Sequence, residues 1–276
     1  MSTERIGKKI RTLTAVGLAS ALLGAPAFAQ RGGGGGQGGG QGGPGAGPGG
    51  GPGGPTITDP KEADAYKAYV AAKGDDRIKK GTDFITNYPK SVAAATVGEQ
   101  VVSLEYQKQD WPAFYSASDK YLAIAPDDSG ILAVTAWVIA RNFKDGQTSP
   151  TLDQAEKDAK HALDTLATKQ KPPNMPDDQF TKGKATIASQ AHSALGLVYG
   201  RQQKPTEAAA ELEQVANPDG TDVYILGASY EMLGKHVEAT QEFKKCATMP
   251  GVLQQPCGQN ADQTSKEGPD GPPPSN

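Results

Sequence analysis

The segment TDVYILGASYEMLGKHVEATQEFKKCATMP, residues 221–250, decides the fold. Its larger apolar side chains recur every three or four residues, at Val223, Leu226, Tyr230 and Leu233. Residues with this spacing lie on one face of an α-helix. The segment is long enough for two such helices, so it predicts a helical hairpin.

The same helical spacing continues upstream to Asp59, and short groups of helix-breaking residues interrupt it. The stretch ILAVTAWVIA, residues 131–140, could be a buried strand. Its length, its three alanines and the lack of other strand candidates favour a buried helix. We therefore predict an array of five hairpins that share one continuous core, at about 59–88, 91–126, 128–169, 177–217 and 221–250.

Small and large residues stand at matching positions in the last two hairpins. The small ones are Gly196, Gly227, Ala208 and Ala239, and the large ones are Tyr199, Leu212, Tyr230 and Phe243. With these residues the chain resembles the tetratricopeptide repeat family. The stretch DFITNYPKS, residues 83–91, is similar to hairpin ends in exported envelope members of that family from bacteria. The small residues stand where two helices approach to about 8–9 Å, and the large ones fill the space between hairpins. The resemblance implies an all-α solenoid of about five such hairpins.

The first three hairpins match the repeat less well. Trp111 and Pro126 fit the second hairpin, but Phe114 stands where the family has alanine. The third hairpin has a longer internal loop, residues 144–150. In shape the resemblance extends over the whole helical region, 57–250.

The resemblance also implies a concave groove, lined by the first helix of each hairpin, that holds a peptide or a partner helix. Its positions in the last two hairpins are Gln190, Ser193, Leu197, Arg201, Thr221, Tyr224, Ala228 and Glu231. The alternative is that these residues form only a solvated inner face. We predict a non-enzymatic adaptor that binds a protein or peptide in the cell envelope. The alternatives are an enzyme, or a subunit of one, for envelope polysaccharide or lipid processing, and a structural spacer.

Residues 1–29 have the pattern of a secretory signal peptide. The uncharged apolar part, residues 13–23, follows a basic start that consists of Arg5, Lys8, Lys9 and Arg11. Ala27-Phe28-Ala29 matches a signal-peptidase site, which predicts cleavage between Ala29 and Gln30. The pattern predicts a periplasmic or secreted protein that uses the general export route.

The apolar part of the signal is too short to cross a hydrocarbon core of roughly 30 Å as a helix. We therefore expect no stable membrane insertion after cleavage. A retained N-terminal anchor, lengthened by Ile6 and Ile10, is the alternative.

Both ends of the helical region have compositions typical of disorder. Residues 30–56 consist almost entirely of Gly, Gln and Pro, and they contain 17 of the 35 glycines. This composition predicts a flexible linker. Residues 251–276 are polar and end near Pro272-Pro273-Pro274, which predicts a disordered tail.

Cys246 and Cys257 are the only cysteines. An even number of cysteines in an exported chain predicts a disulfide, here between the last helix of the array and the residues after it. Metal binding by two isolated cysteines is the weaker alternative.

The sequence contains no recognisable catalytic or metal-binding motif. The histidines at 161, 192 and 236 stand in separate predicted helices without metal-ligand spacing, and packing is the simpler role for them. The formal charge of −3 becomes −6 when residues 1–29 are removed, which argues against nucleic acid as a partner. We predict no catalytic residues, no metal and no cofactor.

Overall fold

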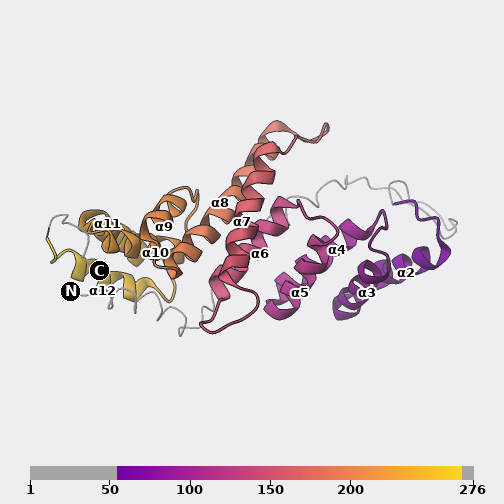
Figure 1. Cartoon of the computed structure of the whole chain (residues 1–276), viewed down its shortest axis with the longest axis horizontal. Coiled ribbons are helices and arrows are strands. Elements are labelled where there is room, and N and C mark those ends of the chain that lie inside the picture. The colour runs from indigo at the N-terminus through magenta and orange to yellow at the C-terminus, as the bar shows by residue number, and fades with distance from the viewer. Residues whose placement is uncertain (1–54, 269–276) are drawn as a thin grey trace, which may run out of the picture. The chain divides into compact units, whose positions relative to one another are not determined.

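The computed structural model describes residues 55–268, and within this range all regular elements are helices (Figure 1). The predicted signal peptide, its predicted cleavage site between Ala29 and Gln30, and most of the predicted linker lie outside the described residues. The helices are α2 (Pro60–Ala71), α3 (Gly74–Asn87), α4 (Ala94–Lys108), α5 (Trp111–Leu122), α6 (Ser129–Asn142), α7 (Leu152–Thr168), α8 (Asp177–Arg201), α9 (Pro205–Leu212), α10 (Gly220–Met232), α11 (His236–Ala247) and α12 (Gln254–Thr264).

The predicted fold class is confirmed. The ten helices from α2 to α11 fall two by two into the five predicted hairpin ranges. The stretch 131–140 is helical as predicted, since it forms most of α6. Most of the side chains of α6 are buried. This is expected, because a helix of 14 residues is stable mainly through packing against its neighbours.

Acidic side chains cap the starts of α2 and α6. Asp59 accepts a hydrogen bond from the backbone N–H of Glu62, and Pro60 occupies the first turn of α2. Asp128 accepts hydrogen bonds from the N–H groups of Gly130 and Ile131 at the start of α6. These contacts satisfy N–H groups that have no partner within the helix.

The described residues form two compact units, 55–131 and 132–268, with the division inside α6. In the first unit, α3 packs against α2, α4 and α5. In the second unit, α8 packs against α7, α9 and α10, and α11 packs against α10 and α12. Contacts between successive hairpins thus continue within each unit, as expected for stacked repeats.

In the second, fourth and fifth hairpins, the turn after the first helix contains a residue with left-handed backbone conformation. These residues are Gln109 (φ 58°), Gln203 (φ 59°) and Gly234 (φ 73°), each just after the first helix of its hairpin. Only glycine adopts this conformation without a steric cost. The same turn therefore recurs in the second, fourth and fifth hairpins, although the sequence shows glycine only in the fifth.

The glycines of the last two hairpins allow the close helix contacts that the resemblance implied. A Cβ on Gly196 would lie 2.4 Å from Cγ of Leu212, and one on Gly227 would lie 2.9 Å from the Phe243 ring. The second hairpin achieves a similar contact with other residues, because a Cβ on Gly98 would lie 2.7 Å from the Tyr121 ring. Phe114, which replaces the alanine of the repeat there, is fully buried and packs edge-on against Tyr106 and Trp111.

The predicted start of the disordered tail is wrong, because α12 occupies residues 254–264. Leu253, Cys257, Ala261 and Thr264 are buried, whereas the intervening Gln and Asp side chains are mostly exposed. This spacing places the buried residues on the face of α12 that packs against α11. Helix α12 therefore covers the end of the array with a polar outer surface, which is the role of a terminal cap in repeat proteins. The sequence did not predict this helix, because glutamines separate the few apolar positions and make the segment polar in composition.

The predicted disulfide between Cys246 and Cys257 is present and joins α11 to α12, with the two Cα atoms 5.7 Å apart. Both cysteines are fully buried. The disulfide thus fastens the terminal helix to the last hairpin.

Candidate interaction surface

Most of the predicted groove residues are not on an open surface. Ser193, Leu197, Tyr224, Ala228 and Glu231 are buried, each with at most 5% of its surface exposed. Thr221 is also buried, and only Gln190 and Arg201 are half-exposed. In this conformation the predicted groove is therefore closed at most of its positions.

Neighbouring helices cover these residues. Arg201 Nε donates a hydrogen bond to the carbonyl oxygen of Ala140 on α6, at 3.0 Å. A Cβ on Gly200 would lie 2.6 Å from Ile225 on α10, so α8 and α10 approach closely. Helix α10 thus packs against α8, and a hydrogen bond joins α8 to α6, at the junction of the first helices of the last three hairpins.

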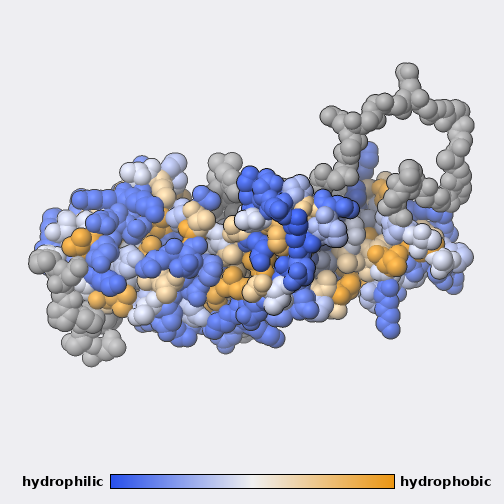
Figure 2. Space-filling view, turned by 90° about the horizontal axis from the view of Figure 1, so that it is seen from above, coloured by the Kyte–Doolittle hydropathy of each residue, from blue (hydrophilic) through white to orange (hydrophobic). Residues whose placement is uncertain are grey.

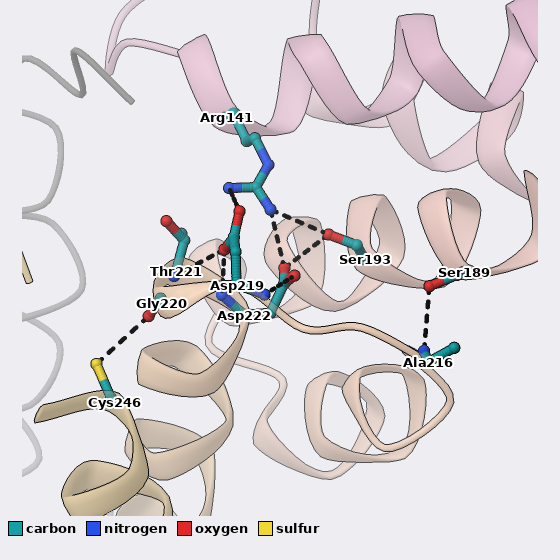
Figure 3. A network of polar contacts seen from close by, with 9 residues as sticks. All are labelled: Arg141, Ser189, Ser193, Ala216, Asp219, Gly220, Thr221, Asp222 and Cys246. Atoms are coloured by element: carbon teal, nitrogen blue, oxygen red, sulfur yellow. Dashed lines mark hydrogen bonds and ion pairs between the residues drawn. The ribbon is translucent and has the colours of Figure 1, made fainter. Parts of the chain in front are cut away.

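A buried ionic cluster, formed by Arg141, Ser193, Asp219 and Asp222, lies at this junction (Figure 3). Arg141 Nη1 lies 3.0 Å from Asp219 Oδ2, and Nη2 lies 3.1 Å from Asp222 Oδ1. Ser193 Oγ donates to the same Asp222 oxygen at 2.6 Å. We call these four residues the Arg141 cluster.

The local structure of α10 positions both carboxylates of the Arg141 cluster. Asp219 is the N-cap, and its Oδ1 accepts hydrogen bonds from the N–H groups of Thr221 and Asp222. Asp222 Oδ2 accepts in return from the N–H of Asp219, which completes a capping box. Each carboxylate therefore has one oxygen held by the helix start and one oxygen that faces Arg141.

Burial differs among the charged groups of the Arg141 cluster. The side chains of Arg141 and Asp222 are 8% and 4% exposed, and that of Asp219 is 52% exposed. Burial raises the pKa of the Asp222 carboxyl, and the Arg141 guanidinium opposes this rise. The guanidinium also lies over the ring of Trp137, 4.3 Å from the ring centroid, one turn earlier on α6.

Sequence reasoning missed the Arg141 cluster. Arg141 follows the apolar stretch 131–140 and Asp219 stands in a group of helix breakers, so each residue had only a local interpretation. The one available signal was a capping pattern, Asp219 followed three residues later by Asp222. Nothing in the sequence related this pattern to an arginine about eighty residues earlier.

A second surface lies at the connection between α7 and α8. Helix α8 has 25 residues, whereas α9, which packs against it, has 8. The loop and first turns of α8, residues 169–186, are largely exposed, and Figure 1 shows this end of the α7–α8 pair extending past α9. We call these residues the projecting segment.

The projecting segment combines apolar and charged side chains. Met175 and Phe180 are half-buried, and Lys184 Nζ lies 5.6 Å from the centre of the Phe180 ring. Lys171 pairs with Asp177, and Lys182 lies 3.8 Å from Asp178. On the face drawn in Figure 2, hydrophobic residues form small groups among hydrophilic ones.

Two further contacts join the outer sides of successive hairpins. Tyr199 donates to Glu156 on α7 at 3.3 Å, and Tyr230 donates to Glu213 after α9 at 2.7 Å. The resemblance assigned both tyrosines only a packing role. The structure adds a hydrogen bond from each to the preceding hairpin.

The histidines occupy separate helices, as predicted. His192 Nδ1 lies 2.7 Å from Glu211 Oε2, and His236 Nδ1 lies 3.4 Å from Glu267 Oε2. Among residues 55–268, no group of three or more His, Cys, Asp or Glu side chains is arranged to hold a metal ion. Within the same range, no helix is both long and apolar enough to cross a membrane.

Comparisons with known proteins add little. No protein-family model matches the chain. No curated protein matches it. A solved structure of a tetratricopeptide repeat protein from Parabacteroides merdae is 14% identical over 69% of this chain and 77% of that one, with a TM-score of 0.31. This likeness is too distant to support an argument, so the fold class rests on the helices and contacts described above.

Proposed function

We propose that the chain is an exported, non-enzymatic helical-repeat adaptor that binds a protein or peptide partner in the cell envelope. The observation that supports binding most directly is the projecting segment. The first turns of α8 lie in this segment and are largely exposed, so burial of apolar side chains there contributes little to the stability of the helix. The segment nevertheless presents the aromatic ring of Phe180 beside Lys184 on a helix, and aromatic side chains are enriched in protein-binding sites.

Affinity capture tests this proposal. The full chain, expressed with its own signal, is recovered from envelope extract together with its partners, which are identified by mass spectrometry. We expect a specific protein whose recovery falls by about tenfold or more with Phe180→Ala, as for an aromatic hot spot. The control is Val70→Ala on α2, because Val70 is also an apolar residue on the surface, with 52% exposed. Recovery of polysaccharide alone, or of nothing, would contradict the adaptor function.

The disulfide supports the proposal of export, since disulfides persist mainly in oxidising compartments. N-terminal sequencing of the protein from the periplasm or the medium tests it. We expect the mature chain to begin at Gln30. A chain that keeps residues 1–29 would instead support the retained anchor.

A further inference from the structure

We infer that the Arg141 cluster is a releasable clamp that keeps the inner face of the last three hairpins closed. The clamp itself is independent of the proposed adaptor function. Only the use of the opened face by a partner rests on that function.

The first reason is the reach of the Arg141 cluster along the array. In stacked repeats each hairpin contacts mainly its neighbours. Arg141, however, belongs to the first helix of the third hairpin, and Asp219 and Asp222 belong to the fifth. Ser193 of the intervening fourth hairpin contacts both Arg141 and Asp222. The Arg141 cluster therefore holds together three hairpins that would otherwise be joined only in sequence order.

The second reason is that the remaining packing does not depend on the Arg141 cluster. The fourth hairpin is held by the Gly196–Leu212 contact, and the fifth by the Gly227–Phe243 contact. Tyr230 also binds Glu213 on the outer side. Loss of the Arg141 cluster therefore leaves each hairpin intact and removes the contacts that join the third hairpin to the fifth. This is the condition for a hinge-like opening between them.

The third reason is what the Arg141 cluster covers. Leu197 lies on α8 one turn after Ser193, which contacts Arg141, and one turn before Arg201, which contacts Ala140. It is 4% exposed. Release of the clamp would weaken the contact between this face of α8 and α6, and Leu197 would become accessible. Leu197 is one of the residues that the resemblance assigned to the groove.

A single introduced thiol can report this opening, because both native cysteines are in the disulfide. The reporter is Leu197→Cys, and the measurement is its rate of reaction with a water-soluble thiol reagent under native conditions, without a partner. We expect slow reaction in the otherwise native chain. Arg141→Met should raise the rate by about tenfold or more, since local opening controls the reactivity of a buried group.

Two further variants keep the test decisive. Arg141→Lys retains the charge but cannot contact two carboxylates with a planar fork, so it should give an intermediate rate even if Arg141→Met folds poorly. Lys80→Met is the control, because it removes an ion pair within α3, between Lys80 and Asp76 at 2.8 Å, and leaves the Arg141 cluster intact. It should leave the rate at Leu197→Cys unchanged.

A second reporter separates local opening from general unfolding. Ala162→Cys lies on α7 and the native alanine is fully buried. The inference predicts that Arg141→Met raises the rate at position 197 and not at position 162. It is overturned if the rate at 197 does not change, or if both positions become reactive together. Neither result would bear on capture of a partner by the projecting segment.

Discussion

Arg141 on α6 and Asp222 on α10 are 81 positions apart in the chain, and Arg141 Nη2 lies 3.1 Å from Asp222 Oδ1. Both side chains are almost fully buried. Taking two charges out of water is costly, and their mutual attraction repays this cost only when the hydrogen-bond geometry is good. Here Ser193 and the backbone of Asp219 satisfy the remaining capacity of Asp222.

Removal of one partner from this pair should be more damaging than removal of both charges. We expect Arg141→Met to lower the free energy of unfolding by about 3–5 kcal/mol, because Asp222 then remains buried without a cation. Adding Asp222→Asn should restore much of the loss, since the amide keeps a similar shape without charge. Urea unfolding followed by Trp137 fluorescence, in a Trp111→Phe background, measures both values. Equal losses in the single and double variants would show that the charge on Asp222 is unimportant.

Gly196, one of the two glycines of the repeat pattern, provides a second prediction, about packing. Gly196→Ala should destabilise the chain by about 1–3 kcal/mol, because the added methyl group overlaps Leu212. Gly258→Ala on α12 is the matched control, since a Cβ there has no atom within 4 Å. It should raise stability by about 0.5–1 kcal/mol through helix propensity alone. Urea unfolding followed by circular dichroism measures both, and destabilisation by both variants would contradict the packing argument.

The sequence predicted the helical class, the five hairpins and the disulfide because each depends on local patterns. Apolar spacing specifies a helix within a few turns, and Gly227 and Phe243 are only 16 positions apart. The left-handed turns at Gln109 and Gln203 escaped prediction because glutamine does not mark that conformation. The same turn is visible at position 234, where the residue is glycine.

The closed inner face could not be predicted for a different reason. Whether Ser193 and Leu197 are exposed depends on how tightly α6, α8 and α10 approach one another, and that depends on pairs such as Gly200 and Ile225. These pairs join different hairpins, and a single sequence does not reveal them. The repeat pattern specifies the hairpin more strongly than it specifies the angle between hairpins.

Glu156 gives a prediction about pH. Its hydrogen bond from Lys160, with smaller contributions from Gln202 and Tyr199, holds the pKa of this carboxyl below its usual range. An acid with a lowered pKa in the folded state stabilises the fold above its unfolded pKa of about 4.3, and the effect disappears as pH falls through the folded value. The native chain should therefore be more stable than Glu156→Gln at pH 7, and the difference should shrink towards pH 3.

Thermal unfolding of the two chains at several pH values measures this difference. The matched control repeats the comparison in a Lys160→Met background. There the largest cause of the lowered pKa is absent, so the pH dependence of the difference should be much weaker. A difference that stays constant from pH 7 to pH 3 would exclude a titrating role for Glu156.

The last prediction is about the disulfide and α12. Replacing both Cys246 and Cys257 by alanine should lower the free energy of unfolding by about 3 kcal/mol, mainly because the unfolded chain regains the freedom of the closed loop. Helix α12 contributes few apolar side chains of its own, and it follows the last hairpin in the chain. We therefore expect the loss to be concentrated there. Hydrogen exchange should show lost protection in residues 254–264 and retained protection in α8 and α9. If α12 keeps its protection without the disulfide, its packing against α11 alone is sufficient, and the disulfide stabilises the chain without fastening the cap.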